Sequence, residues 1–306
     1  MKTVSSYQLS ETQRIYAKTQ MDTEKIIQNS TDNCSLVTDN CLGVGIGFRE
    51  PFRADLFLHR DKIDFLEITA DHYFDANPKK LDELDLLQAH FPLIPHGLNL
   101  SLGSAEGIDE NYLEKFAALV EKLDPAWFSD HLCFTKSNGV NIGHLAPVPY
   151  TNEAVKVFVR NISTVKNRIK TPFILENITY NVRFPSSQMS EAEFITTILE
   201  ETDCGLLLDI TNLYINSINF DIDWRKVLDE LPLERVVQLH FVGVHKHGER
   251  LIDAHSNKTN DEIWEIFRTV CKRCDVKGAI LERDENFPPF AEILDEIKTA
   301  KSYFKA

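Results

Sequence analysis

From Leu42 onward, short apolar segments alternate with longer amphipathic segments, and this alternation constrains the fold more than any other feature of the chain. Parallel strands that are covered on both faces read as nearly continuous apolar runs, whereas their connecting helices show one apolar face. The apolar runs are GVGIGF at 43–48, DFLEIT at 64–69, PLIPHGLNL at 92–100, AWFSDHLCF at 126–134, PFILENITY at 172–180, GLLLDIT at 205–211, VVQLHFVG at 236–243 and GAILERD at 278–284. Helical patterns separate them, over 79–90, 109–122, 152–168, 191–201, 223–231, 261–271 and 289–298.

Eight strands with intervening helices and no further domain predict an α/β fold of the closed (β/α)8 TIM-barrel class, which typically needs about 250 residues. An open doubly wound sheet is the alternative, but its phosphate-binding fingerprint is missing. The glycines at 43, 45 and 47 are not followed by a helix start at the required offset, so they are interpreted as part of a first strand. We therefore expect a single barrel domain over residues 42–306, preceded by a polar extension over residues 1–41.

The charge and cysteine content narrow the class of protein. A net charge of −14, from 47 acidic and 33 basic residues, disfavours nucleic acid and anionic membranes as partners. No apolar run reaches the roughly 20 residues that span a bilayer, and the N-terminus lacks the apolar core of a secretory signal. Six scattered cysteines do not form a disulfide scaffold, which favours a reducing cytoplasm. Cys271 and Cys274 have CxxC spacing, but they follow a helical pattern and have no second pair, so we interpret them as ordinary helix cysteines.

Residues of metal-ligand type recur at or just after the ends of the predicted strands. From the third strand onward, each strand carries one. They are His96, His131, Glu176, Asp209, His240 and Glu282. Further candidates are Asn212, three residues after Asp209, and Asp253 with His255 after the seventh strand, while the second strand contributes Glu67.

Each of these residues has an ordinary explanation when it is taken alone, since a single histidine in a strand is more often a satisfied core residue than a ligand. The joint pattern is harder to explain without metal, because burying an unpaired carboxylate costs several kcal/mol. Lysine and arginine are nearly absent from these strands, Arg283 being the exception, so dications are the natural counter-charge. Imidazole and carboxylate ligands suit zinc, iron or manganese rather than calcium or magnesium.

The strand-end ligands, with one shared carboxylate, predict two ions about 3.5–4 Å apart, as in dinuclear sites. Asn212, Asp253 and His255 would supply a third position. This third position is the weaker inference, because an amide is a poor ligand beside imidazole.

Nine segments, in order from Leu42 to Ile297, resemble the signature segments of one family. They are GIGFR at 45–49, PHGLNLSLG at 95–103, SDHLCF at 129–134, LAPVPYT at 145–151, LENITY at 175–180, LLLDITNLY at 206–214, QLHFVG at 238–243, LIDAHS at 251–256 and LERDENFPP at 281–289. The chain resembles the multinuclear non-heme iron-dependent oxidative enzymes, formerly domain of unknown function 692, which include the methanobactin-biosynthesis oxidase.

The resemblance implies a barrel related to those of xylose isomerase-like proteins and type IV apurinic endonucleases. It implies two or three iron ions and O2 as co-substrate in a four-electron or similar oxidation, with zinc or manganese as other metals that the purified protein could carry. The expected substrate is a cysteine, or otherwise an aspartate or asparagine, of a ribosomally made precursor peptide. A separate partner protein that recognises the leader peptide is also implied, and self-association of the chain stays open.

By analogy with the trinuclear endonucleases, the first ion is expected at His96, His131 and Glu176. The second is expected at Glu176, Asp209, His240 and Glu282, and the third at Asn212, Asp253 and His255. Glu176 and Asp209 are then also the predicted catalytic residues. Two departures from the family pattern, Thr211 in place of an amide and Asp130 where glutamate is frequent, remove no ligand but put the identity of the substrate in doubt.

Four residues near the expected barrel mouth are predicted to contact substrate: Arg49, Glu67, His72 and His144. For each, a structural role competes with this interpretation, an ion pair in the case of Arg49. The long connection at 135–151 contains Asn138-Gly139, a type I′ hairpin signal, and is expected to form an excursion over the mouth.

Three other classes of function stay open from the residues alone. A zinc phosphodiesterase could use the same ligands, although the −14 charge argues against DNA. A sugar isomerase on a similar barrel would need a catalytic lysine at a strand end, and none is evident. A non-catalytic metal-binding subunit of a biosynthetic complex would keep the ligands without turnover.

Overall fold

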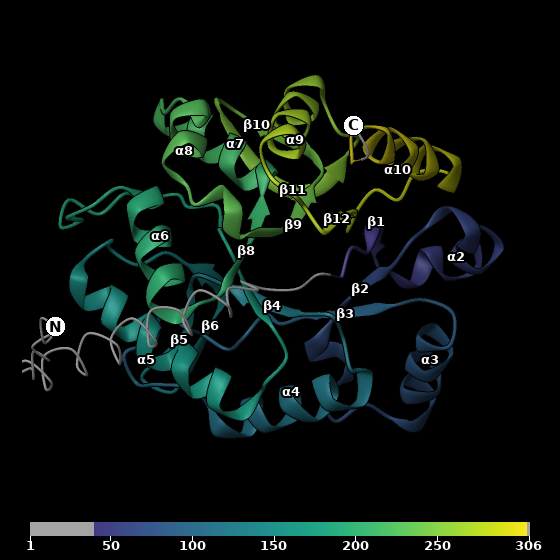
Figure 1. Ribbon diagram of the computed structural model, residues 1–306, viewed down its shortest axis with the longest axis horizontal. Coiled ribbons are helices and arrows are strands. Elements are labelled where there is room, and N and C mark those ends of the chain that lie inside the picture. The colour runs from purple at the N-terminus through teal and green to yellow at the C-terminus, as the bar shows by residue number, and fades with distance from the viewer. Residues whose placement is uncertain (1–39, 305–306) are drawn as a thin grey trace, which may run out of the picture. The chain divides into compact units, whose positions relative to one another are not determined.

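The computed structural model describes residues 40–304, and all statements below concern these residues. Eight parallel strands close into a barrel in the order β1-β12-β9-β8-β7-β4-β3-β2, with helices around the outside (Figure 1). The barrel strands are β1 (Gly43–Gly47), β2 (Leu66–Thr69), β3 (Leu93–His96), β4 (Phe128–His131), β7 (Phe173–Glu176), β8 (Gly205–Asp209), β9 (Val236–Phe241) and β12 (Gly278–Leu281). The predicted TIM-barrel class is confirmed, and the extension predicted over 1–41 lies outside the described residues up to residue 39.

Helices follow the strands, most of them where the amphipathic segments predict. They are α2 (Arg53–Leu58), α3 (Pro78–Gln88), α4 (Glu110–Leu123), α5 (Asn152–Arg168), α6 (Glu191–Thr202), α7 (Ile210–Phe220), α8 (Trp224–Glu230), α9 (Asp261–Arg273) and α10 (Phe290–Phe304). Side-chain caps start several of them, among them Asp109 on α4 and Thr151 on α5. None of the described helices is both long and apolar enough to cross a bilayer.

Helix α7 was absent from the predicted pattern because β8 runs into it without a loop. Asp209 ends the strand and also caps the helix, its Oδ1 accepting from the Asn212 amide at 2.8 Å. Leu213, Ile215 and most other residues of this helix as far as Ser217 are buried, so it shows little polar face. A short buried helix of this kind cannot be told from a buried strand by its periodicity.

Two antiparallel hairpins rise from the strand ends. The first, β5 (Phe134–Ser137) with β6 (Val140–Ala146), turns at Asn138-Gly139, where both residues have positive φ. The turn predicted from the Asn-Gly pair is therefore present. The second hairpin, β10 (Gly243–His247) with β11 (Arg250–Asn257), was not predicted, because its charged strands carry little hydrophobic alternation.

An apolar layer fills the barrel interior towards the N-terminal ends of the strands, and the polar site lies next to it, at their C-terminal ends. One packed cluster contains Phe65, Ile94, Trp127, Ile174, Leu207, Val237 and Ile280, contributed from around the barrel. Side chains alternate with period two along a strand, so the residue two positions later points to the same interior. Two positions after five of these apolar residues stand polar ones: Glu67 follows Phe65, His96 follows Ile94, Glu176 follows Ile174, Asp209 follows Leu207 and Glu282 follows Ile280. The apolar layer thus places five polar residues in one inward-facing ring above it.

Gly45 on β1 is needed for the close approach of the neighbouring chain. A Cβ at this position would lie 2.2 Å from the carbonyl oxygen of Phe65, which is backbone and cannot turn aside. We expect Gly45→Ala to lower the free energy of unfolding by about 1–3 kcal/mol, as overpacking does, measured by urea denaturation. Gly47→Ala is the control, because there a Cβ meets only the flexible end of Arg49 at 3.2 Å. Equal losses in the two variants would contradict this explanation.

Candidate metal centre

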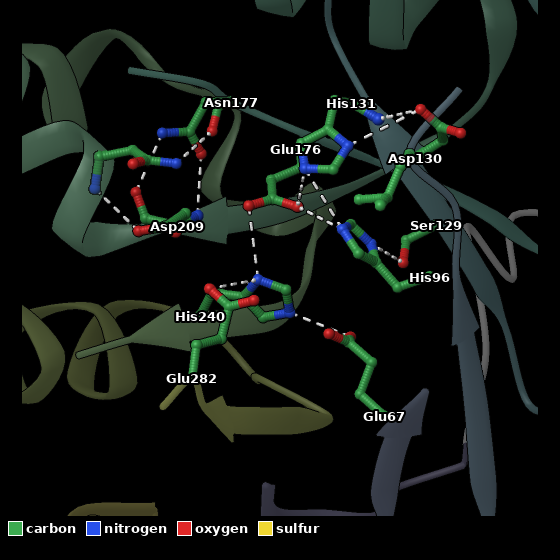
Figure 2. A network of polar contacts seen from close by, with 12 residues as sticks. Glu67, His96, Ser129, Asp130, His131, Glu176, Asn177, Asp209, His240 and Glu282 are labelled. Carbon is green, nitrogen blue, oxygen red and sulfur yellow. Dashed lines mark hydrogen bonds and ion pairs between the residues drawn. The ribbon is translucent and has the colours of Figure 1, made fainter. Parts of the chain in front are cut away.

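Glu176 lies at the middle of the polar ring, at the end of β7. Its Oε2 is 3.3 Å from Nε2 of His96 and 3.3 Å from Nε2 of His131. Its Oε1 is 3.4 Å from Nδ1 of His240 on the opposite side (Figure 2). Each carboxylate oxygen therefore faces a different set of imidazoles, as a carboxylate shared between two ions does.

Two groups of donor atoms meet at Glu176. The first consists of His96, His131 and Glu176. The second consists of Glu176, Asp209, His240 and Glu282. Within each group, one donor atom per residue lies within 4.8 Å of every other, and all six residues are buried. The structure thus brings together the ligand sets expected for the first and second ions.

The residues expected at a third position line the same cavity. His255 Nε2 is 2.8 Å from Asp253 Oδ1 and 3.6 Å from Glu282 Oε2. Asn212, Asp253 and His255 all border a cavity of about 340 Å³ together with Glu176 and Glu282. They belong to neither of the two close donor groups, so a third position stays a prediction.

Several buried polar atoms at the centre lack a hydrogen-bond partner among the described residues. They are Glu176 Oε2, His131 Nδ1, Asn212 Oδ1, His240 Nδ1, Asp253 Oδ1 and His255 Nε2. An unsatisfied buried polar group costs about 1–3 kcal/mol. Burial, and then the carboxylates of Glu176 and Glu282, raise the pKa of Asp209 well above its ordinary value. Divalent cations would satisfy the unpaired atoms and the crowded carboxylates together, so the residues fit the metals that the resemblance implies.

Several histidines of the centre contact a second polar group through the ring nitrogen that faces away from Glu176. The Nδ1 of His96 is 2.8 Å from the Ser129 hydroxyl, and the Nδ1 of His255 is 3.0 Å from Asp284 Oδ2. His131 differs, because Asp130 Oδ1 lies 3.8 Å from its Nδ1, too far for a hydrogen bond, whereas a partner within hydrogen-bond distance constrains a ring. Such partners fix which ring nitrogen carries the proton and which is free to bind a metal. In all three rings Nε2 is the nitrogen that faces the carboxylates of the centre.

Sequence reasoning did not identify Ser129, Asp284 or Asn177 as site residues. Asn177 ties β7 to β8, because its amide donates to Asp209 O at 2.9 Å and accepts from Asp209 N at 2.8 Å. Ser129 could have been found, since it stands two positions before His131 on the same strand and so faces the same side. Asp284 gave no such signal, because it lies in an irregular segment after β12.

The four residues predicted to contact substrate are placed differently from one another. Arg49, Glu67 and His72 line the cavity, but His144 is exposed on β6 and the structure does not bring it there; its neighbour Leu145 lines the cavity instead. Arg49 is held by Asp284, with Nε 2.6 Å from Oδ1. Burial, followed by Arg49 and Lys80, lowers the pKa of His72. Glu67 contacts His240 at 3.0 Å.

Comparison with protein families gives a match over most of the described chain. Residues 43–305 match the sequence model of the family described as "RiPP precursor modification enzyme MbnB/TglH/ChrH". A UPF0276 protein of Caulobacter vibrioides is 35% identical over 265 residues, covering 86% of this chain and 95% of that protein. A UPF0276 protein of Vibrio vulnificus is 32% identical and covers 86% of this chain and 92% of its own length.

Solved structures with the same fold include sugar-converting enzymes. The 3-keto-D-glucoside 4-epimerase YcjR from E. coli matches with a TM-score of 0.54 and 12% identity, covering 85% of this chain and 99% of its own. A putative xylose isomerase from Rhodospirillum rubrum matches with a TM-score of 0.53 and 12% identity, covering 86% and 98%. At this identity the likeness shows the barrel and not the reaction. Within the described part of the chain, no lysine lines the metal-centre cavity.

Proposed function

The chain belongs to the RiPP precursor modification enzymes of the MbnB/TglH/ChrH family, and we propose that it oxidises one residue of a precursor peptide with iron and O2. A cysteine is the first choice of target, and an aspartate or asparagine the second. The observation that carries this proposal is the Glu176 carboxylate, whose Oε2 faces His96 and His131 and whose Oε1 faces His240. Such an arrangement is built to hold two ions next to each other rather than one.

The ligand assignment follows the two donor groups. His96 and His131, with Glu176, would hold the first ion. Asp209, His240 and Glu282, again with Glu176, would hold the second. When bound, iron supplies the one-electron chemistry with O2 that redox-inactive zinc lacks. In this assignment Glu176 and Asp209 are catalytic because they hold the reacting centre directly.

A third ion at Asn212, Asp253 and His255 is part of the proposal. Asn212 Oδ1 is a buried polar atom without a hydrogen-bond partner among the residues described, and Asp253 Oδ1 and His255 Nε2 face each other at 2.8 Å on the wall of the same cavity. Because Glu282 Oε2 lies 3.6 Å from His255 Nε2, this position would share Glu282 with the second ion.

The cavity above these ligands accepts a side chain rather than a folded protein. Its volume of about 340 Å³ is at the small end for ligand sites, and Leu98, Leu145 and Ile178 supply apolar walls. A thiolate is the strongest candidate ligand for an ion in such a site, because it binds soft metals better than a hydroxyl or an amide does. Arg49 and His72 lie at the edge of the cavity, where they would orient the peptide around the reacting residue.

The peptide is expected to arrive with a separate protein that recognises its leader, since the cavity has room for little beyond the modified residue. We place the reaction in the cytoplasm, where the precursor peptide is made.

The test is reconstitution of the metal-free protein with Fe(II) without oxygen, followed by addition of O2 and the candidate precursor peptide. A change in peptide mass that requires both Fe(II) and O2 is the expected result. Protein loaded with Zn(II) is the control, and it should leave the peptide unchanged. Modification with Zn(II) alone would contradict the proposal in favour of a hydrolase, whereas metal uptake without O2 consumption would indicate a non-catalytic subunit.

A further inference from the structure

Three buried polar side chains form a chain of hydrogen bonds that ends on His240. Trp127 Nε1 donates to Gln238 Oε1 at 2.7 Å, and Gln238 Nε2 donates to Glu67 Oε2 at 2.6 Å. Glu67 Oε2 also lies 3.0 Å from Nε2 of His240 (Figure 2). Trp127, Gln238 and His240 are 0% exposed and Glu67 is 4% exposed, so solvent does not compete for these contacts.

The direction of the hydrogen bonds is set at the bottom of this chain. An indole N–H can only donate, so the Gln238 group that faces Trp127 must be its carbonyl oxygen. The amide of Gln238 must then present its NH2 to Glu67, and Glu67 must accept. Because the Glu67 carboxylate is an acceptor, it can also accept a hydrogen bond from Nε2 of His240 when that nitrogen carries the proton. The Trp127 indole thus determines which end of the Gln238 amide faces Glu67.

His240 differs from the other three histidines in the nitrogen that it turns towards the centre. Its Nδ1 lies 3.4 Å from Glu176 Oε1 and 3.2 Å from Glu282 Oε2, while Nε2 points back at Glu67. A neutral imidazole carries its proton on one nitrogen only. For Nδ1 to bind a metal, the proton must stay on Nε2, where an acceptor has to receive it.

We propose that Glu67, oriented by Gln238 and Trp127, is a positioning residue that selects the Nε2-protonated tautomer of His240 for the second ion. This inference rests on the metal centre of the proposed function and replaces the expectation that Glu67 contacts substrate. Gln238 Nε2 also lies 3.0 Å from Nε2 of His240. Without Glu67, the Gln238 amide would donate its N–H to Nε2 of His240 instead. Nε2 would then be the acceptor and the ring proton would lie on Nδ1, where it prevents this nitrogen from binding a metal.

The experiment measures zinc affinity step by step, with a competing chelator, in the metal-free full chain. Glu67→Leu removes the acceptor and is expected to weaken the second ion about 100-fold, while Glu67→Gln, which keeps an oxygen, weakens it about 10-fold. The first ion should be unaffected in both. Ser129→Ala is the matched variant, because it removes the partner of His96 and should weaken the first ion instead. Glu83 is a buried carboxylate that pairs with Arg53 and Lys80, so Glu83→Gln is the control and should leave the affinity for both ions unchanged.

The tautomer itself is read by long-range proton–nitrogen NMR of zinc-loaded protein with ¹⁵N-labelled histidine. The wild-type spectrum should contain a ring protonated on Nε2 that disappears in His240→Ala. At a zinc concentration that fills both wild-type positions but leaves the second position of Glu67→Leu empty, that variant should show the same ring protonated on Nδ1. A merely structural role of Glu67 would change stability without changing the tautomer. If Glu67→Leu does not fold, Trp127→Phe removes only the donor that orients Gln238 and is expected to weaken the second ion by a smaller factor.

The outcomes separate this inference from the proposed function. An unchanged second affinity and an unchanged tautomer in Glu67→Leu, or in Trp127→Phe if it replaces it, would overturn the role of Glu67 alone. If the wild-type protein binds two zinc ions but has no iron- and O2-dependent activity, the proposed function is wrong and the role of Glu67 is unaffected. A wild-type protein that binds no zinc would contradict both.

Discussion

Replacement of Glu176 by glutamine is expected to abolish binding of both ions of the pair. Glu176 is the one residue common to both donor groups, and the substitution removes its charge with little change in volume. Loss of a residue that supports a ligand weakens metal binding about 10- to 100-fold, so loss of the shared ligand itself should cost more than about 100-fold at both positions. Metal analysis after gel filtration, together with zinc titration, measures the effect.

Thermal unfolding gives a second readout of the same variant. Zinc at 1,000 times its dissociation constant stabilises a folded protein by about 4 kcal/mol, provided the unfolded chain does not bind it. For a barrel of this size, that corresponds to roughly 10 °C. The wild-type protein should show this increase in Tm on addition of zinc, and Glu176→Gln should show almost none.

Two single-site variants serve as matched controls. His131 belongs to the first group only, so the His131→Ala protein should lose the first ion and keep the second. Asp209→Asn belongs to the second group only and should show the opposite selectivity. Retention of both ions at wild-type affinity in Glu176→Gln would refute the shared-carboxylate arrangement.

Glu296→Gln is expected to destabilise the fold by about 3–5 kcal/mol, the cost of leaving a buried charge without its partner. Glu296 on α10 is 2% exposed and lies 2.9 Å from Arg283, which is 3% exposed. Its second oxygen accepts from the Thr259 amide at 2.8 Å. Arg283 directly follows Glu282, so this ion pair also anchors the chain just after β12, where Glu282 belongs to the candidate metal centre.

Urea denaturation of the metal-free protein measures the loss of stability without a contribution from bound ions. The same substitution at Glu265, which pairs with Arg225 on the surface at 2.6 Å, is the control and should cost less than about 1 kcal/mol. Similar losses at the two positions would show that burial of the Arg283 pair is not what makes it matter.

The barrel and most of its centre could be predicted from the sequence, because both follow from short-range patterns. A buried parallel strand must be apolar throughout, so a histidine or glutamate at its end is visible as an exception. His96, Glu176 and Asp209 were found in this way. Closure of the barrel then brings together residues that lie far apart in the chain.

Other features could not be predicted, because they depend on which side chain meets which across the barrel. Nothing in the sequence around Glu67 shows that it faces His240, 173 positions away. The role of Asp284, which contacts both Arg49 and His255, has the same origin. The helix α7 was missed for a local reason, since a strand and a buried short helix have similar composition.

The most direct test of the metal centre is anomalous diffraction at the iron absorption edge from crystals prepared with Fe(II) in the absence of oxygen. Two strong peaks are predicted on opposite sides of the Glu176 carboxylate, one beside His96 and His131 and the other beside Asp209, His240 and Glu282. A weaker third peak is predicted near Asp253 and His255. A single peak with Glu176 as a terminal ligand, or iron bound only outside the barrel, would contradict the shared centre.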